Sequence, residues 1–453
     1  MKHTPLTIIL STLSLSLVAC APVDGADDDI TTEAQALSGA RPVSPLTQGV
    51  FGPMGTNVWS SGGGSNRWSD ITLADVDGNG LDDLCGRYGD SWGCSLRPSN
   101  ATDFEGWVEA REVRSFSRST VRLVDVDRDG RADVCGRDVS GYRCLLSRPS
   151  GSSITFVAPT AANGARVTYV ADMRSANGWG SAQYESTVML GRLEGARGLD
   201  VCARGSAGVI CHFNIGATSP MVRSPQIATD FSDANGWNRP EHFSTLTLAD
   251  VNGDGRDDLC GRGGDGVYCA LYDHLTRAFG PATLWTTQFS DGAGWNNPRY
   301  FASLRFADVN GDGAVDVCGR GGGGVYCGMS DARGSFMNAH AVMLTGLSDA
   351  AGFGDGARPM NLTLTDFDND GRADLCMAGP FNTTTSWGQP TVREELFCAR
   401  SRTLFGISFD ALARRTDVSG IFDHVRAGRI RSNSRGFCYV DLIGNDVRCT
   451  NAW

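Results

Sequence analysis

A nine-residue acidic loop recurs five times along the chain and is its clearest candidate for chemistry. The pattern is Asp-x-Asp/Asn-x-Asp/Asn-Gly-x-x-Asp, so oxygen-bearing side chains stand at positions 1, 3, 5 and 9 around a glycine. Calcium prefers such sites, because it takes roughly six to eight oxygen ligands in a flexible geometry. The candidate metal ligands are Asp75, Asp77, Asn79 and Asp83; Asp125, Asp127, Asp129 and Asp133; Asp250, Asn252, Asp254 and Asp258; Asp308, Asn310, Asp312 and Asp316; and Asp366, Asp368, Asp370 and Asp374.

The repetition of the loop decides between a metal site and an ordinary solvated turn rich in Asp and Gly. Five copies with one spacing favour calcium, and we expect about five ions with a structural role. The loops are not EF-hands, because their twelfth position is Gly or Met and offers no bidentate Glu. Two related segments, 192–200 and 428–436, lack most or all of the carboxylates, and we expect no metal in them.

The cysteines mark seven repeats and predict a disulfide in each one. With a two-residue turn at 264–265, Cys260 would lie directly opposite Cys269 in a non-hydrogen-bonded pair, with Cα atoms about 4.5 Å apart. Of the fifteen cysteines, this pairing leaves only Cys20. The expected pairs are Cys85 with Cys94, Cys135 with Cys144, Cys202 with Cys211, Cys260 with Cys269, Cys318 with Cys327, Cys376 with Cys398, and Cys438 with Cys449.

The repeat that begins at Phe231 shows the local structure we expect. Apolar residues alternate with threonine before the acidic loop, which is the periodicity of a strand. Leu259 to Arg262 then form a second expected strand, and Val267 to Leu271 a third. Short strands, regular turns and repeats spaced 50 to 67 residues apart predict an all-β fold. The fold class we predict is a seven-bladed β-propeller with four-stranded antiparallel blades.

The two ends of the propeller segment predict how the ring closes. Ala278-Phe279-Gly280-Pro281 is expected to begin a fourth strand, and the similar string at 50–53 precedes the first acidic loop. The chain ends four residues after the last cysteine, so the seventh unit lacks a fourth strand of its own. Residues near 47–59 are therefore expected to supply that strand and to close the last blade, which would leave no open edge.

The N-terminal segment predicts export and a lipid anchor. Residues 1–19 have the apolar run of a secretory signal peptide, and Leu17-Val18-Ala19-Cys20 looks like a bacterial lipobox with Cys20 as the lipidated residue. An ordinary signal peptide with an incidental cysteine is the alternative. Residues 20–44 are acidic and aperiodic, as in a flexible tether, and 45–453 form the propeller. Disulfides need an oxidising compartment, and Ala21 rather than Asp after Cys20 resembles outer-membrane sorting in lipoproteins of enterobacterial type. We therefore expect a bacterial outer-membrane lipoprotein, periplasmic or surface-exposed.

The net charge of −11 comes largely from the acidic loops, and no basic footprint for nucleic acid is present. No further segment is long and apolar enough to span a bilayer, so contact with the membrane is expected only through the lipid. Catalytic signatures such as Gly-x-Ser-x-Gly and His-Glu-x-x-His are also absent from the sequence. The chain is therefore not expected to be an enzyme.

The segment from Asp250 to Asp258 resembles the FG-GAP/VCBS calcium repeat of integrin α-subunit propellers and of many bacterial surface proteins. The fuller unit, with Gly-Trp ahead of the loop and Gly-Val-Tyr after it, is similar to the seven-bladed lectin propellers of fungi and insect-pathogenic bacteria. The likeness covers roughly residues 45–453 and is strongest from 231 to 330. Those lectins resemble this chain without its disulfides. The resemblance implies binding of carbohydrate.

The connectors between repeats carry the ligand positions that this resemblance implies. Gly236-Trp237 with His242 fits the lectin motif best, and the other two connectors fit it less completely. Packing between blades and a ring face offered to a sugar both stay open for the tryptophans, because aromatic side chains serve either purpose. The candidate ligand-binding residues are Trp179, Tyr184, Trp237, His242, Trp295 and Tyr300.

These features together predict a non-catalytic binding module at the cell envelope, stabilised by calcium, which recognises glycans or mediates adhesion. A protein-binding envelope scaffold, similar to integrin propellers, is the alternative. A hydrolase or lyase acting on a polysaccharide or ester through a loop-borne site is a third hypothesis, because fold does not dictate function. The partner is accordingly a glycan or a surface protein.

Overall fold

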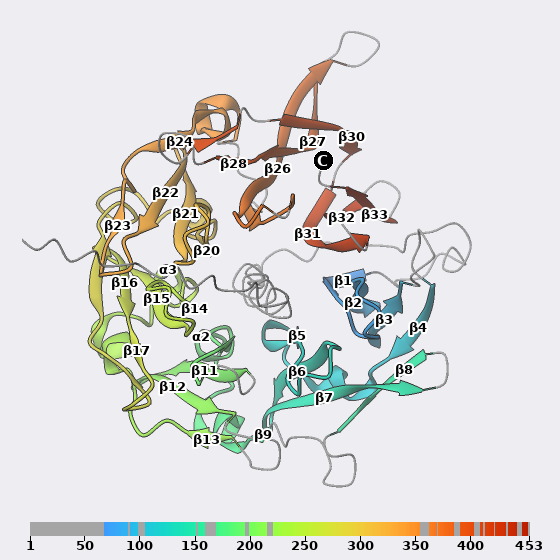
Figure 1. Cartoon of the computed structure of the whole chain (residues 1–453), viewed down its shortest axis with the longest axis vertical. Coiled ribbons are helices and arrows are strands. Elements are labelled where there is room, and N and C mark those ends of the chain that lie inside the picture. The colour runs from blue at the N-terminus through green and yellow to red at the C-terminus, as the bar shows by residue number, and fades with distance from the viewer. Residues whose placement is uncertain are drawn as a thin grey trace, which may run out of the picture.

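Antiparallel sheets follow one another around a central axis in the computed structural model (Figure 1). Within each sheet the strands pair in chain order, with the first strand nearest the axis, as in a propeller blade. The structure describes residues 68–88, 91–97, 105–150, 153–158, 169–194, 199–214, 221–353, 362–368, 370–384, 390–402, 408–410, 413–420, 422–431, 434–441 and 446–451.

The first three blades have four or five strands each. Blade one contains β1 (Trp68–Ala74), β2 (Asp83–Tyr88), β3 (Ser91–Leu96) and β4 (Glu105–Glu109); blade two contains β5 (Arg122–Val124), β6 (Asp133–Asp138), β7 (Gly141–Ser150), β8 (Ser153–Val157) and β9 (Tyr169–Val170); and blade three contains β10 (Met189–Gly191), β11 (Asp200–Gly205), β12 (Gly208–Phe213) and β13 (Val222–Arg223).

The next three blades repeat this order. Blade four contains β14 (Thr247–Ala249), β15 (Asp258–Gly263), β16 (Gly266–Ala270) and β19 (Thr283–Thr286); blade five contains β20 (Arg305–Ala307), β21 (Asp316–Gly321), β22 (Gly324–Ser330), β23 (Phe336–Met337) and β24 (Val342–Leu344); and blade six contains β25 (Leu362–Thr365), β26 (Asp374–Thr384), β27 (Pro390–Ala399) and β30 (Ala413–Gly420). Accessory hairpins are formed by β17 (Tyr272–Asp273) with β18 (Ala278–Phe279), and by β28 (Ser401–Arg402) with β29 (Ser408–Phe409).

The described residues form six complete blades rather than the seven that the repeat predicts. The seventh repeat forms a three-stranded sheet of β31 (Phe422–Arg431), β32 (Ser434–Asp441) and β33 (Asp446–Asn451). This sheet lies between blades six and one, where β31 contacts both β25 and β1 (Figure 1). The strand expected from residues 47–59, the signal peptide, the tether and Cys20 all lie outside the described residues.

The second and third strands of each blade have the register that the cysteine spacing predicts. Cys260 lies opposite Cys269, with a Cα–Cα distance of 4.2 Å, and Gly263 and Gly266 close the hairpin. Six disulfides are confirmed: 85–94, 135–144, 202–211, 260–269, 318–327 and 376–398. Cys438 lies opposite Cys449 in the register of β32 with β33, but the side chains of this sheet lie outside the described set.

The expectation that Ala278 to Pro281 begin the fourth strand of blade four is wrong. Ala278 and Phe279 belong to the accessory hairpin, and the fourth strand is β19. The hairpin forms because the Phe279 ring packs on the buried Tyr272 ring, with a centroid distance of 5.5 Å. Tyr272 in turn contacts Phe213 of blade three, so the hairpin fastens two blades together.

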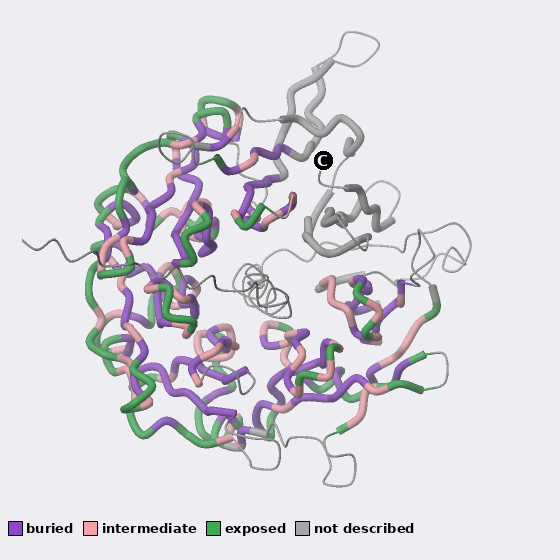
Figure 2. Tube along the Cα trace, viewed as in Figure 1, coloured by how far each residue is buried: buried purple, intermediate pink, exposed green. Residues whose placement is uncertain are grey.

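Buried side chains fill the interfaces between neighbouring blades (Figure 2). One core cluster joins Met189 and Val209 of blade three to Leu248 and Leu259 of blade four. Burial of such side chains stabilises the ring by about 1.5–3 kcal/mol each. Three four-residue helices, which the sequence did not predict, lie in the connectors: α2 (Ala182–Glu185), α3 (Pro240–Phe243) and α4 (Pro298–Phe301). None of the helices in the described part of the chain could span a bilayer.

Candidate functional site

The connectors and the acidic loops lie at opposite ends of the innermost strands, because each connector precedes such a strand and each acidic loop follows it. In blade four, α3 comes before β14 and the loop from Asp250 to Asp258 comes after it. The chain therefore offers two separate candidate sites, one at each end of these strands. We describe the connector end first.

The three candidate tryptophans are buried in the core. Trp179, Trp237 and Trp295 are 9%, 6% and 2% exposed. Trp295 meets the rings of Phe289 and Tyr300 at centroid distances of 4.7 and 5.9 Å, and a Cβ added to Gly319 would come within 2.8 Å of its indole. This burial favours packing between blades over a ring face offered to a sugar. Glycan contact by these residues stays a prediction.

The tyrosines of two connectors bind a carboxylate from the connector that follows. Tyr184 Oη donates to Asp233 Oδ2 and Tyr300 Oη donates to Asp349 Oδ2, each at 2.8 Å. The sequence separation is 49 residues in both pairs, so the contact spans one whole repeat. Burial, and then the hydrogen bond to the carboxylate, raises the pKa of both tyrosines. Their hydroxyls therefore remain protonated donors at neutral pH.

A buried arginine forms an ion pair with each of these carboxylates. Arg204 pairs with Asp233 and Arg320 pairs with Asp349, and both guanidinium groups are fully buried. The partner aspartate side chains are 29% and 39% exposed, and in each of them one oxygen pairs with the arginine and the other accepts from the tyrosine. The Asp349 backbone N–H also donates to Gly322 O at 2.9 Å, which fixes the carboxylate against the hairpin turn of the same repeat.

His242 takes the tyrosine position in the third copy of this arrangement. Its Nδ1 lies 2.8 Å from Gly236 O, and its buried Nε2 has no hydrogen-bond partner within the described residues. Arg262 pairs with Asp291 here, as in the other two copies. Burial lowers the pKa of His242, so the ring is neutral at pH 7. The imidazole is shorter than a phenol, and the hydrogen bond to the aspartate is missing in this copy.

The arginines and aspartates of this cluster were missed by sequence reasoning, although the sequence carries a signal for both. The arginines follow a disulfide cysteine in Cys-x-Arg, and the aspartates directly follow a serine and stand three residues ahead of the glycine of Gly-Trp or Gly-Phe. We name the cluster the connector triads, which consist of Tyr184, Arg204 and Asp233; His242, Arg262 and Asp291; and Tyr300, Arg320 and Asp349.

The first aspartate of each acidic loop organises the loop around its own carboxylate. Asp75 Oδ1 accepts from the backbone N–H groups of Gly78 and Asn79 at 2.7 and 3.1 Å, and its Oδ2 accepts from Gly80 at 2.7 Å. Asp125, the equivalent residue of blade two, accepts the same three bonds. Gly78 has φ +81°, a conformation that glycine adopts without steric cost.

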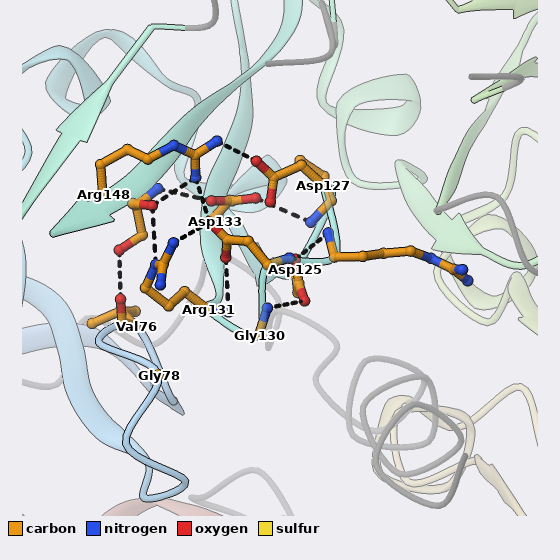
Figure 3. A network of polar contacts seen from close by, with 12 residues as sticks. Val76, Gly78, Asp125, Asp127, Gly130, Arg131, Asp133 and Arg148 are labelled. Carbon is orange, nitrogen blue, oxygen red and sulfur yellow. Dashed lines mark hydrogen bonds and ion pairs between the residues drawn. The ribbon is translucent and has the colours of Figure 1, made fainter. Parts of the chain in front are cut away.

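The last aspartate of each loop is buried and connects the loop to the chain at or just beyond the end of the third strand, as Asp133 does in blade two (Figure 3). Asp258 Oδ2 accepts from Val251 N at 3.3 Å and its Oδ1 accepts from Tyr272 N at 2.8 Å. Burial, together with the neighbouring loop carboxylates, raises the pKa of Asp83 and of Asp258 to about 8. These groups are therefore destabilised as anions unless a cation is added.

Several loop carboxylates lie close enough to share one cation. Carboxylate oxygens within 4.8 Å of one another are contributed by Asp75, Asp77 and Asp83, by Asp125, Asp127 and Asp133, and by Asp366, Asp368 and Asp374. Asp127 is 10% exposed, and its Oδ1 is buried without a hydrogen-bond partner among the described groups. An unsatisfied buried oxygen beside two further carboxylates fits a hard cation such as calcium.

Blades four and five carry an asparagine at the third loop position. Asn252 and Asn310 accept at Oδ1 from the backbone N–H of Asp254 and Asp312, at 2.9 and 2.8 Å. Each loop therefore keeps its oxygen-bearing side chains together on one short turn. Asp308, which opens the blade-five loop, has a raised pKa because of burial.

The degenerate third loop uses protein contacts where the other loops have carboxylates. Glu194 accepts from Tyr272 Oη at 2.7 Å and pairs with Arg277 at 3.2 Å. Asp200 still accepts from Leu193, Glu194 and Asn214 N–H groups at 2.7–2.9 Å. The ninth position is therefore structural even without the other candidate ligands. In the seventh repeat, residues 428–431 and 434–436 belong to paired strands.

No protein-family model and no curated protein matches this chain. Among solved structures, a lectin of Agrocybe aegerita, described as recognising non-reducing terminal N-acetylglucosamine, is similar with a TM-score of 0.61. The identity is 22%, and the alignment covers 83% of this chain and 86% of the lectin. At this identity the likeness shows the fold, an all-β propeller with four-stranded antiparallel blades.

Two larger proteins also align with the chain. The TcdB2-TccC3-Cdc42 structure gives a TM-score of 0.36 at 18% identity, over 74% of this chain and 15% of that one. The Vibrio cholerae biofilm matrix protein Bap1 gives 0.27 at 15% identity, over 67% of this chain and 40% of its own. These scores are too low to support an argument about either fold or function.

Proposed function

We propose that this protein is a non-catalytic carbohydrate-binding module of the bacterial cell envelope. The observation that carries the proposal is the threefold repetition of the connector triads, each with a partly exposed aspartate paired with a buried arginine. The similar fold of a lectin that recognises N-acetylglucosamine supports the same conclusion. Sugar hydroxyls are strong donors to a carboxylate that is already oriented, because little entropy is lost on binding.

The surroundings of the triad of Tyr300, Arg320 and Asp349 suit a sugar ring. A Cβ added to Gly322 would lie 3.0 Å from Tyr300 Oη and 3.5 Å from Asp349 Oδ2, so backbone without a side chain approaches both groups. Tyr326 is half-buried beside Trp295, with ring centroids 6.1 Å apart. A bare backbone, an oriented carboxylate and an aromatic ring offer hydrogen bonds and an apolar face together. Repetition would add avidity to weak single sites.

Calcium belongs to this proposal as a structural cofactor of the acidic loops. The raised pKa values of Asp83 and Asp258 and the unsatisfied Oδ1 of Asp127 support it. A bound cation would neutralise the crowded carboxylates at the end of the innermost strands. The sugar would bind at the opposite end, so the metal would stabilise the blades without touching the ligand.

Lipid attachment at Cys20 and placement in the outer membrane complete the proposal, and both rest on the N-terminal sequence. The disulfides fit an oxidising compartment such as the periplasm or the cell surface. Labelling with a radioactive fatty acid, lost in Cys20→Ser, would test the anchor. If the Cys20→Ser protein still carried the fatty-acid label, the proposed anchor would be overturned.

The glycan proposal is tested by retention of the full chain on immobilised N-acetylglucosamine with calcium present. We expect the triple variant Asp233→Asn, Asp291→Asn, Asp349→Asn to lose retention while its disulfides and circular dichroism stay as in the wild type. Asp265→Asn is the matched control, because Asp265 is an exposed aspartate that accepts from Tyr268 Oη and has no arginine partner within the described residues. A folded triple variant that is retained like the wild type would contradict the proposal.

A protein-binding scaffold is the second candidate, and the outer strands favour it. Leu284 of β19, Met337 of β23 and Val342 of β24 are large apolar residues, 40%, 50% and 37% exposed. Contiguous exposed apolar patches mark protein interfaces, and we infer that these side chains on blades four and five belong to one. A glycan array without signal, together with a defined envelope protein captured by the wild type and lost in Leu284→Ser with Val342→Ser, would support this function instead.

A further inference from the structure

The three connector triads are not equivalent, because His242 stands where the other two copies have a tyrosine. We propose that this copy is the principal sugar-binding subsite of the ring and that it recognises two neighbouring hydroxyls of one sugar. The inference rests on the proposed carbohydrate binding and specifies which triad carries it out. A ligand hydroxyl would take the place that the tyrosine hydroxyl holds in the other copies.

The imidazole of His242 lies in the same pose as the tyrosine rings. Its centroid is 5.9 Å from that of Trp237, with an interplanar angle of 63°, and the equivalent rings of the next repeat lie 5.9 Å apart at 62°. Asp291 follows His242 by 49 residues, as each partner aspartate follows its tyrosine. Arg262 is fully buried and pairs with the aspartate, as Arg320 does. The triads therefore differ mainly at the tip of one ring, where the shorter imidazole ends before the position of the phenol oxygen.

No other described side chain takes over the position of the phenol oxygen in the His242 copy. In the tyrosine copy of the next repeat, a Cβ added to Gly322 would lie 3.0 Å from Tyr300 Oη and 3.5 Å from Asp349 Oδ2. At the equivalent Gly264, the only atom of a non-adjacent described residue within 4 Å of the added Cβ would be Asp291 Oδ2, at 3.8 Å. Gly264 is partly exposed, so this position lies where a ligand can approach from solvent.

Two hydrogen-bond acceptors border this position. His242 Nδ1 lies 2.8 Å from Gly236 O, which can only accept, so Nδ1 carries the proton and Nε2 of the neutral ring is an acceptor. The side chain belongs to a residue that is only 5% exposed, and its Nε2 has no partner within the described residues. Asp291 Oδ1 pairs with Arg262, while in the described structure its Oδ2 has one long contact, 3.4 Å from Arg239 Nη1. A buried nitrogen without a partner beside a weakly bonded carboxylate oxygen requires donors from outside the protein.

Two acceptors at one position require two donors on neighbouring atoms. A lone hydroxyl has one proton and would satisfy one acceptor, whereas a vicinal diol of a sugar ring carries two O–H groups on adjacent carbons. One O–H would donate to His242 Nε2, and the other would donate to Asp291 Oδ2 in place of the long contact. An ammonium group also donates twice, but Arg239 and Arg262 both lie at the carboxylate and repel a second cation. Water is the remaining double donor, and the experiment below separates it from a diol.

Arg239 gives this copy a further group for sugar recognition. Its side chain is 48% exposed and pairs with Glu241 as well as with Asp291. The equivalent residues of the other two copies are Ser181 and Asn297, which carry no charge. A guanidinium has five N–H donors, so Arg239 can donate to the oxygen of a hydroxyl whose proton is given to the carboxylate. The copy without the tyrosine hydroxyl is thus also the copy with an additional donor for a sugar.

Calorimetric titration of the full chain with the methyl β-glycoside of N-acetylglucosamine tests the subsite. We expect one principal site per chain, and an affinity about two- to tenfold lower for the 3-deoxy and 4-deoxy sugars, which lack one hydroxyl of the pair. His242→Tyr should weaken binding at least about tenfold, because the phenol places a protein oxygen where the ligand hydroxyl would lie. The variant should fold, since two copies already carry tyrosine there. His274→Tyr is the matched control, because His274 is exposed in the turn of the accessory hairpin.

The nitrogen-15 resonance of His242 Nε2 locates the contact independently of affinity. Addition of the sugar should shift this resonance, which is assigned by its absence from the His242→Tyr spectrum. A bound sugar that leaves the resonance unshifted, or equal affinity for the deoxy sugars, would show that water rather than a diol lies at Nε2 and would overturn the inference.

The remaining outcomes separate the subsite from the carbohydrate binding on which it rests. If folded His242→Tyr binds the sugar like the wild type, or if three equal sites are measured, the His242 subsite is overturned. Loss of retention in the triple aspartate variant would then still support the proposed function. If the folded wild type is not retained on immobilised N-acetylglucosamine, the proposed function itself is overturned.

Discussion

Replacing Trp295 by alanine separates a core tryptophan from one that faces a ligand. Its indole is 2% exposed and packs on Phe289, Tyr300 and Tyr326 at centroid distances of 4.7, 5.9 and 6.1 Å. Truncation removes this contact area and leaves a cavity that strand β21 cannot fill, because Gly319 and Gly321 supply no side chains there. Large-to-small changes of this kind cost about 3–5 kcal/mol.

The expected change in melting temperature follows from the size of the chain. Unfolding entropy is about 2.1 cal/mol/K per residue, so for 453 residues each kcal/mol corresponds to about 1 °C if the ring melts as one unit. Differential scanning calorimetry with calcium present should therefore show a decrease of about 3–5 °C. Trp295→Phe should show a smaller decrease, because the phenyl ring fills part of the space.

Leu275→Ala is the matched control for loss of a large apolar side chain, since Leu275 is 82% exposed. Its cost should stay within about 0.5 kcal/mol. If Trp295→Ala melts with the wild type but no longer binds immobilised N-acetylglucosamine, then the indole faces a ligand and the core interpretation fails. A lowered melting temperature with retained binding supports packing.

Three further changes test the acidic loops and the blade contacts. Asp83 and Asp258 have pKa values of about 8 in the folded protein against an ordinary 3.8, so the stability they contribute is full below about pH 4 and is lost as the pH rises through 8. The calcium-free protein should therefore have a lower melting temperature at pH 8 than at pH 5. An equal decrease in melting temperature with saturating calcium would contradict a metal in these loops. Asp200→Asn should lower the free energy of unfolding by about 1–3 kcal/mol with or without calcium, because Asp200 accepts three backbone N–H bonds in the degenerate loop, where we expect no metal. Urea titration in calcium and in chelator measures this cost, and a cost that depends on calcium would contradict the prediction. Tyr272→Phe should cost about 1 kcal/mol through the lost bond to Glu194, and a variant as stable as the wild type would show that this contact adds nothing.

The spacing of the repeated residues was sufficient to predict much of the blade. A turn of two residues places Cys260 opposite Cys269, because pairing in a hairpin is fixed by the length of its turn, and the observed register agrees. The accessory hairpin escaped prediction for the opposite reason. Ala278 and Phe279 have strand propensity, but which strand they join depends on the Tyr272 ring, which lies six to seven residues away along the chain.

The sequence by itself determined the acidic loops, the cysteine pairs and the succession of short antiparallel strands, because each depends on residues a few positions apart. Only the tertiary structure decided that Trp295 is buried and that Asp349 binds both Tyr300 and Arg320, because Asp349 belongs to the repeat that follows theirs. It alone also decided that Arg148 reaches Asp127 while Arg256 turns to the neighbouring blade. Side chains with the same local pattern differ in role because closing the ring gives each one different neighbours.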